Sequence, residues 1–200
     1  MPPVKARYDD LAPRYERAMR PLERWFLTRW RAETLAHLPA DSRILEVGAG
    51  TGLNFRFYPR GAHGVASELS GEMLKIAAGK SKPEGVCLTQ NSAELMPFRD
   101  GTFDAAFATL VFCSVASPPK AFAELRRVVK PGGAIIMLEH VRPQGLLGPI
   151  FDLISLFTVW LFDDHCNRRT ADEAQRAGLR LMRVEPRVQG IFNLIVLERV

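Results

Sequence analysis

The sequence predicts an α/β fold in which short parallel strands alternate with helices. Three observations support this. A short apolar strand at residues 44–47 runs directly into a glycine-rich turn, and apolar segments of strand length alternate with segments of helical spacing as far as residue 138. The chain has 200 residues, of which 47% are hydrophobic and 24% charged, enough for one α/β domain with a proper core.

The strand and turn at residues 44–52 organise the rest of the chain. Glu46 interrupts an otherwise apolar strand, and Gly48, Gly50 and Gly52 follow at alternate positions. Such glycines let a ligand lie directly against main-chain N–H groups, and a following helix would point its positive dipole end at the same ligand. A dinucleotide site has a different glycine spacing, so an NAD-type site is disfavoured. Glu46 would repel a pyrophosphate but could hold, directly or through water, the cationic amino-acid part of S-adenosylmethionine (SAM).

Residues 1–40 are predicted to form a helical cap that could face a membrane. Apolar and aromatic side chains recur here at steps of three and four, and Pro13 and Pro21 are expected to divide the segment into two or three short helices. Seven arginines are interleaved with them: Arg7, Arg14, Arg17, Arg20, Arg24, Arg29 and Arg31. The segment could lie in a bilayer interface. Alternatively, Trp25, Phe26 and Trp30 pack on the sheet while the arginines are solvated.

The next units follow the α/β pattern. Residues 63–67 read as a second strand ending at Glu68, residues 72–79 as a helix and residues 86–90 as a third strand. Glu68 lies twenty positions after Gly48, where a carboxylate can reach the ribose hydroxyls of a bound nucleoside. The alternative is a surface residue that caps the next helix.

The second half begins with an apolar run at 105–112, typical of a central strand buried on both faces. Thr109 and Leu110, near its carboxyl end, are expected beside the ligand. A helix at 121–129, a strand at 134–138, a helix at 170–177 and two antiparallel strands at 178–186 and 190–199 complete the predicted domain, residues 41–200. The apolar insert at 142–170 is too interrupted to span a bilayer and is expected to form a lid or an interfacial helix.

Three blocks resemble the class I SAM-dependent methyltransferases, in the order found in that family. They are the Glu46-x-Gly48-x-Gly50-x-Gly52 turn, the block from Ser92-Ala93-Glu94 through Pro97-Phe98 to Phe103-Asp104, and Lys130-Pro131-Gly132-Gly133 before a strand. The resemblance covers about residues 44–141. It implies a Rossmann-like seven-stranded mixed sheet of order 3-2-1-4-5-7-6, with helices on both faces, an N-terminal helical extension and a helical lid insert. The implied cofactor is SAM, with S-adenosylhomocysteine as product, and no metal.

The resemblance also implies which residues bind the cofactor. These are Tyr8, Glu46, Gly48, Ala49, Gly50, Gly52, Glu68, Leu69, Met73, Ser92, Ala93, Glu94, Thr109 and Leu110. Ser92 departs from the family, which usually has Asp there to bind the adenine amine. Adenine recognition would then rest more on the Ala93 backbone N–H.

Shorter segments resemble two groups of methyltransferases that act on lipophilic acceptors. Residues 8–16 resemble enzymes acting on quinone precursors and on phosphatidylethanolamine. Residues 55–59, 109–115, 138–141 and 162–167 resemble membrane-associated alkyl thiol methyltransferases. The expected function is methylation of a phospholipid amine head group or an alkyl thiol at a membrane surface. Alternatives are C-methylation of a quinone precursor and a non-catalytic module that binds SAM or lipid.

Candidate catalytic residues follow from the need to deprotonate an amine or a thiol. His140, at the end of the fifth strand, is the best-placed base, with a structural hydrogen-bonding role as the alternative. Asp163 and His165 form a second pair, for which capping is the alternative. Tyr15, like Tyr8, could close over SAM or bind an acceptor head group, or simply pack on the sheet.

Charge and composition limit the partners. The net charge of +5 favours an anionic partner, and an anionic membrane surface fits better than nucleic acid because no basic run interleaved with aromatics follows one element. The chain begins without an apolar signal core, so the expectation is a cytoplasmic monomer, peripheral at the inner membrane face.

Overall fold

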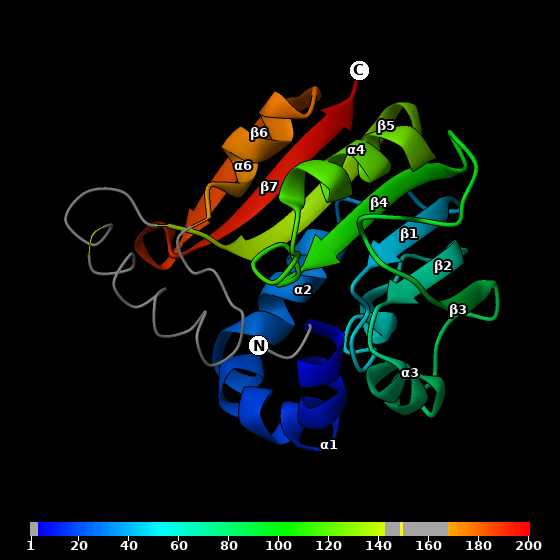
Figure 1. The fold of residues 1–200 in the computed structure, drawn as a ribbon, viewed down its shortest axis with the longest axis vertical. Helices are drawn as coiled ribbons and strands as arrows, with labels where there is room; N and C mark the ends of the chain where they lie inside the picture. Colours follow the sequence, from blue (N-terminus) through cyan, green and yellow to red (C-terminus); the bar gives the residue numbers. More distant parts are fainter. Residues whose placement is uncertain (1–3, 143–148, 150–167) are drawn as a thin grey trace.

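The computed structural model describes residues 4–142, 149 and 168–200, and its centre is a seven-stranded mixed sheet (Figure 1). The strands are β1 (Arg43–Val47), β2 (His63–Glu68), β3 (Val86–Gln90), β4 (Phe103–Thr109), β5 (Val129–His140), β6 (Leu179–Arg187) and β7 (Phe192–Arg199). Their order is β3-β2-β1-β4-β5-β7-β6, with β1 to β5 parallel and β7 antiparallel to both of its neighbours. The predicted fold class and strand order are confirmed.

The order of strands reverses between β1 and β4, which fixes the place of the site. These two strands pair in parallel, with Val47 opposite Ala108. Their carboxyl ends therefore emerge side by side, and the glycine turn follows one while Thr109 ends the other. A crevice at such a switch point is where open parallel sheets bind ligands.

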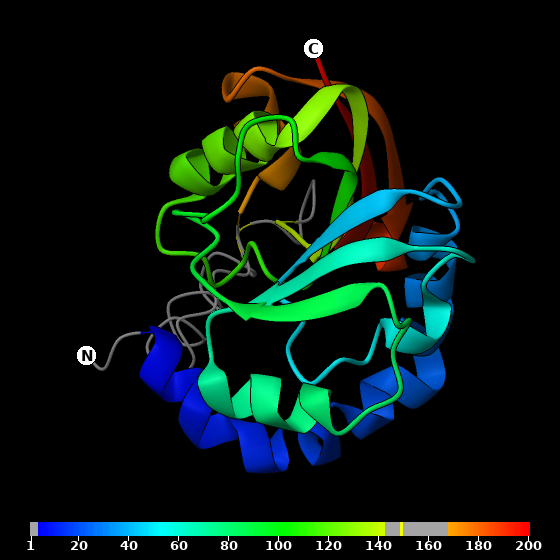
Figure 2. The same ribbon diagram turned by 90° about the vertical axis from the view of Figure 1, so that its right-hand side faces the viewer.

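Helices cover both faces of the sheet (Figures 1 and 2). On one face, α4 (Pro118–Val128) and α6 (Thr170–Arg176) contribute Phe122, Leu125 and Ala174 to the largest apolar cluster. On the other, α2 (Thr28–Leu35) and α3 (Gly71–Ala78) pack through Leu35 and Ala77. Side chains alternate along a strand, so consecutive residues of β1 and β4 belong to different clusters.

The N-terminal segment differs from the prediction because Pro13 does not end a helix. α1 (Val4–Leu22) continues through Pro13 and Pro21, and a π-helical turn, η1 (Glu23–Leu27), joins it to α2. Proline removes one hydrogen bond within a helix, a cost that packing of α1 against α3 outweighs (Figure 2). The predicted boundary between the N-terminal cap and the rest of the chain, near residue 40, lies in the connection between the end of α2 at Leu35 and the start of β1 at Arg43.

Several boundaries also differ from the predicted ones. Turns and a short 3-10 helix, η2 (Phe55–Phe57), follow the glycine turn, so no α-helix points its N-terminus at the ligand there. β4 ends at Thr109 because Leu110 adopts a positive φ of 59°. β5 begins at Val129, which pairs with Phe103 ahead of a bulge.

Most of the predicted insert, residues 143–148 and 150–167, lies outside the described residues, and so do Asp163 and His165. Within the described part of the chain, none of the helices combines the length and the apolar character needed to cross a bilayer.

The core predicts a contrast in stability between two substitutions. Phe107 is 1% exposed and packs edge-to-face on Tyr58, with ring centroids 5.5 Å apart. Phe107→Ala should lower the free energy of unfolding by about 3–5 kcal/mol, because the cavity left behind adds to the lost burial. Leu95→Ala, at a side chain 78% exposed, should change it by less than about 0.5 kcal/mol. Equal effects in urea denaturation would contradict the described packing.

Candidate functional site

A cleft opens at the carboxyl ends of β1, β2 and β4, beneath the inner face of α1. Its empty volume, open solvent at the mouth included, is about 820 Å³. A second cavity of about 230 Å³ adjoins it, and the two share Tyr15, Gly48, Gly50 and Thr109. Most of the predicted cofactor residues line the larger cavity: Tyr8, Gly48, Gly50, Glu68, Leu69, Met73, Ser92, Ala93, Glu94, Thr109 and Leu110. Ala49 lines the smaller one.

The three glycines of the turn have different physical roles. All adopt positive φ, between 55° and 80°. A Cβ added to Gly48 would lie 2.4 Å from Val111 Cγ2, and one added to Gly52 would lie 2.5 Å from the Phe55 ring. A Cβ on Gly50 would meet nothing within 4 Å. Gly48 and Gly52 are therefore required by packing, and Gly52 lines neither cavity, whereas Gly50 presents backbone without a side chain to both cavities.

Glu68 is held in place by backbone donors on the wall of the larger cavity. Gly50 N donates to its Oε2 at 2.9 Å, while Leu69 N and Ser70 N donate to its Oε1 at 2.9 and 2.8 Å. Burial raises the pKa of this carboxyl, and the three N–H groups oppose that shift. The carboxylate is thus oriented in advance, with spare lone pairs to accept hydroxyl donors.

Glu46 lies behind the cavity wall and lines neither cavity. It is fully buried, Asn54 Nδ2 donates to its Oε1 at 2.5 Å, and the Tyr58 hydroxyl donates to its Oε2. Burial raises its pKa to about 7 against these two donors. The structure therefore places Glu46 one layer beneath the wall of the larger cavity, and its assignment as a cofactor-binding residue stays a prediction.

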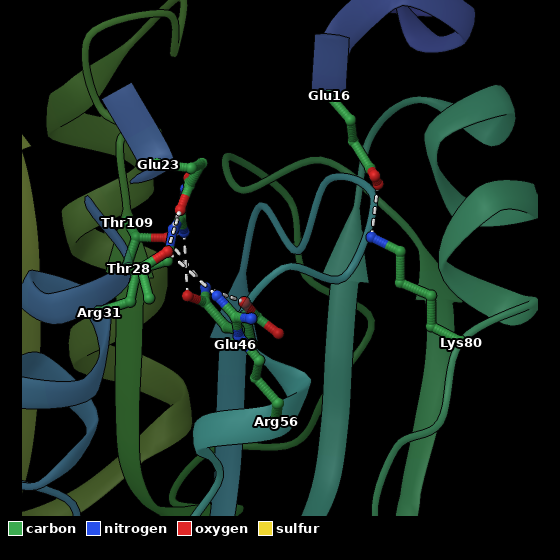
Figure 3. Close-up of polar contacts among 9 residues, drawn as sticks. Glu16, Glu23, Thr28, Arg31, Glu46, Arg56, Lys80 and Thr109 are labelled. Carbon is green, nitrogen blue, oxygen red and sulfur yellow. Dashed lines mark hydrogen bonds and ion pairs between the residues drawn. The ribbon is translucent and has the colours of Figure 1, made fainter. Parts of the chain in front are cut away.

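Arg31 is a site residue that the sequence reasoning missed. It is 3% exposed, lines the smaller cavity and contacts three separate segments of the chain (Figure 3). Its Nε and Nη2 contact Glu23 Oε1 at 2.9 and 2.8 Å, and its Nη1 donates to Asn54 Oδ1 at 2.9 Å and to Thr109 Oγ1 at 2.6 Å. These contacts use four of the five guanidinium N–H groups. A signal was present in the sequence. Arg31 lies on the same helix face as Leu27, Trp30 and Thr34, so the helical spacing indicated a side chain directed toward the core.

The loop after β4 is held by two further residues that the sequence reasoning missed. Val111 N and Phe112 N donate to Glu139 Oε1 at 3.0 and 3.2 Å, while Arg168 donates to the carbonyl oxygens of Phe112 and Val115. The loop carries Val111 and Val115 to the cavity wall. Glu139 and Arg168 therefore position that wall.

The predicted catalytic residues are only partly brought together. Tyr15 lines both cavities, and burial raises its pKa to about 12. The Tyr8 hydroxyl lies 2.8 Å from Ser114 Oγ, and both residues line the larger cavity. The His140 ring packs edge-on against Phe192, with centroids 6.3 Å apart, and lines neither cavity. Its assignment as a base stays a prediction. Among residues 4–142 and 168–200, no group of His, Cys, Asp and Glu lies together as a metal site requires.

The Glu46 environment predicts a pH-dependent difference in stability. Because burial raises its pKa from 4.5 to about 7, the folded state binds the proton more tightly than the unfolded state. The free energy of unfolding of wild type, minus that of Glu46→Gln, should therefore fall by roughly 3 kcal/mol as the pH rises from 4.5 to 7. Above pH 7 the difference should level off. Urea denaturation of both proteins across this range measures the difference. Parallel pH profiles would contradict the assignment.

Comparison with known proteins agrees with this arrangement. A family model described as "Methyltransferase domain" matches residues 45–137. A demethylmenaquinone methyltransferase from Thermus thermophilus is 36% identical over 152 residues, covering 72% of this chain and 69% of that protein. The Homo sapiens thiol S-methyltransferase TMT1B is 38% identical over 109 residues, covering 51% and 44%. The chain spans 60–69% of the length of three bacterial demethylmenaquinone methyltransferases.

A solved structure shows the same fold over almost the whole chain. The SAM-dependent methyltransferase from Thermotoga maritima has a TM-score of 0.75 and 21% identity, covering 98% of this chain and 100% of that one. At 21% identity this similarity shows the fold alone. The family of the chain is shown by the Thermus relative, together with the matched domain. The chain belongs to the SAM-dependent methyltransferases, whose methyl donor is SAM and whose product is S-adenosylhomocysteine.

Proposed function

We propose that this protein transfers the methyl group of SAM to a lipophilic acceptor held in the larger cavity. The observation that carries the proposal is the two-sided character of this cavity. One side presents the bare Gly50 backbone and the oriented Glu68 carboxylate. The other side is formed by aliphatic side chains from α1 and from the segment after β4: Val4, Leu110, Val111, Val115 and Ala116.

The residues of the polar side fit SAM. Glu68 would accept the ribose hydroxyls beside Gly50, and Arg31 would face the carboxylate of the methionine part from the smaller cavity. Ser92 Oγ already accepts from Glu94 N at 3.1 Å, whereas the buried Asn91 Oδ1 on this wall has no hydrogen-bond partner among the described residues. Asn91 would then accept from the adenine amine where the family has Asp at position 92. When bound, SAM supplies a methyl group on a good leaving group, its sulfonium.

The apolar side supports a neutral acceptor that reacts as its anion, and an alkyl thiol is the first candidate. A phospholipid ammonium group would need an uncommitted carboxylate on the wall. Among the described residues lining the cavity, Glu68 accepts from three backbone donors, and Glu94 Oε1 accepts from Ser117 N at 2.8 Å. The ribose hydroxyls of SAM would take the remaining lone pairs of Glu68, which leaves the second oxygen of Glu94 as the one carboxylate acceptor for a cation among these residues, so the phospholipid amine is the less favoured acceptor.

Catalysis on this proposal is mainly positioning and exclusion of water. Tyr15, with its pKa raised to about 12, stays protonated near neutral pH and donates a hydrogen bond rather than taking a proton. The thiol of cysteine has an ordinary pKa near 8.5 and a simple alkyl thiol a higher one, so only a small fraction of the acceptor would be ionised near neutral pH. Bases at His140 or at the Asp163 and His165 pair remain predictions.

A quinone precursor is the second candidate. Three relatives named demethylmenaquinone methyltransferase match 70–72% of this chain at 35–36% identity, whereas the Mus musculus thiol S-methyltransferase TMT1B matches 71% at 32% identity. The apolar wall suits such an acceptor equally well. The attacking atom would then be a ring carbon rather than sulfur.

An acceptor panel tests the proposed function. With labelled SAM, we expect label transfer to a long-chain alkyl thiol in detergent. The rate should rise about tenfold per pH unit below the pKa of the thiol, because only the anion attacks. Phosphatidylethanolamine should take no label. Transfer to a demethylated quinol alone would favour the second candidate. Transfer to none of the three by protein that binds S-adenosylhomocysteine would overturn the proposal in favour of a non-catalytic module.

Two glycine substitutions test the cofactor side. Gly50→Ala and Gly132→Ala both place a side chain at positive φ (55° and 76°), and neither Cβ meets a protein atom within 4 Å. Only Gly50 lines the cavities. Gly50→Ala should weaken S-adenosylhomocysteine binding at least tenfold in calorimetric titration, because its methyl group occupies ligand space. Gly132→Ala should bind like wild type. Equal affinities of all three would place the ligand elsewhere.

A further inference from the structure

We infer that the junction of α1 and η1 docks on the surface of an anionic lipid bilayer. The docking face consists of three apolar side chains, Leu22, Trp25 and Phe26, and three arginines, Arg17, Arg20 and Arg24. The inference concerns a surface outside both cavities and holds for any acceptor.

The three apolar side chains of the docking face are large and exposed to solvent. Trp25 is 73% exposed, Phe26 46% and Leu22 43%. Within the part of the chain that the structure describes, Trp25 and Phe26 are the only aromatic residues among the exposed large hydrophobic side chains. Tryptophan and phenylalanine at an exposed helix end are the side chains that insert at the headgroup level of a bilayer.

The π-helical turn and a ring stack hold these side chains outward. η1 (Glu23–Leu27) accommodates one extra residue, so that Leu27 is 1% exposed while Trp25 and Phe26 face solvent. The Phe26 ring stacks on Trp30 with centroids 5.4 Å apart, and Trp30 contacts Phe192 of β7 at 5.3 Å. The exposed surface is therefore backed by the sheet and is already in place before any partner arrives.

The exposed charged side chains of residues 17–29 are all arginines. Residues 17–29 contain four arginines and a single acidic residue, Glu23. Glu23 points inward to Arg31 at 2.8–2.9 Å, so its charge is compensated inside the protein (Figure 3). Arg20 and Arg24 are exposed, and Glu16, which lies one turn before Arg20 and attracts it, is paired with Lys80. Such a face complements anionic lipid headgroups.

The docking face lies close to the cavity along the same helix. Tyr15, which lines both cavities, precedes Leu22 by seven residues, a rise of about 10 Å along a helix. A bilayer bound at this junction would therefore stand near the wall that Tyr8 and Tyr15 form.

Vesicle flotation of the full chain tests the inference. We expect wild type to float with phosphatidylcholine vesicles that contain phosphatidylserine and to remain behind with phosphatidylcholine alone, with binding weakened by salt. Trp25→Ser with Phe26→Ser, and separately Arg20→Glu with Arg24→Glu, should each lower the vesicle affinity at least tenfold.

Matched controls separate a docking face from general stickiness or charge. Met182→Ser with Val184→Ser alters exposed apolar residues of β6, and Arg60→Glu with Lys120→Glu makes the same change in net charge on other exposed side chains. Both controls should bind vesicles within twofold of wild type. Unchanged S-adenosylhomocysteine affinity in every variant shows that the fold and the cofactor site are intact, which keeps this test independent of the acceptor.

Three results would overturn the inference. They are no flotation of wild type at low salt, an equal loss in the controls, and a change from dimer to monomer by light scattering when Trp25 and Phe26 are replaced without any vesicle binding by wild type. The last result would make the face an interface between copies of this chain.

Discussion

The buried Arg31 guanidinium is the constraint on which the rest of the site depends. Removing an ion of this kind from water costs several kcal/mol unless its hydrogen bonds are satisfied. Here the acceptors come from three places: Glu23 in the π-helical turn, Asn54 after the glycine turn, and Thr109 at the end of β4. One side chain thus ties the N-terminal helices to the point where the strand order reverses. Those helices supply the cavity wall that Tyr8 and Tyr15 form.

Asn54 extends this network beneath the glycine turn. Its Oδ1 accepts from Arg31, while its Nδ2 donates to Glu46 at 2.5 Å and to Thr109 at 2.9 Å. Tyr58 completes the layer at the other oxygen of Glu46. The same network compensates Glu23 from within, which leaves arginines as the charged groups around the exposed rings of Trp25 and Phe26. Internal electrostatics therefore shapes both the cofactor cavity and the proposed lipid face.

Much of the fold could be predicted because its signals are local. The Gly48–Gly52 spacing, the apolar strands and the terminal hairpin each follow from a few adjacent residues, and the strand order followed from the family resemblance. The continuation of α1 through Pro13 could not be predicted, since it depends on packing against α3. The helical spacing could indicate that Arg31 faces the core, but its role and that of Asn54 depend on contacts across 23 and 55 residues, which no local pattern reveals. Glu46 was expected at the ligand because its position in the strand does not indicate how deeply its side chain is buried.

A crystal structure with S-adenosylhomocysteine bound tests the central claim most directly, namely that the N-terminal helices and the glycine turn enclose one cofactor site. The account predicts ribose hydroxyls on Glu68, backbone contact at Gly50, the amino-acid carboxylate facing Arg31, and Tyr8 and Tyr15 covering the ligand. Density for the ligand outside these two cavities, or a bound ligand that leaves Arg31 and Glu68 without contact, would contradict it.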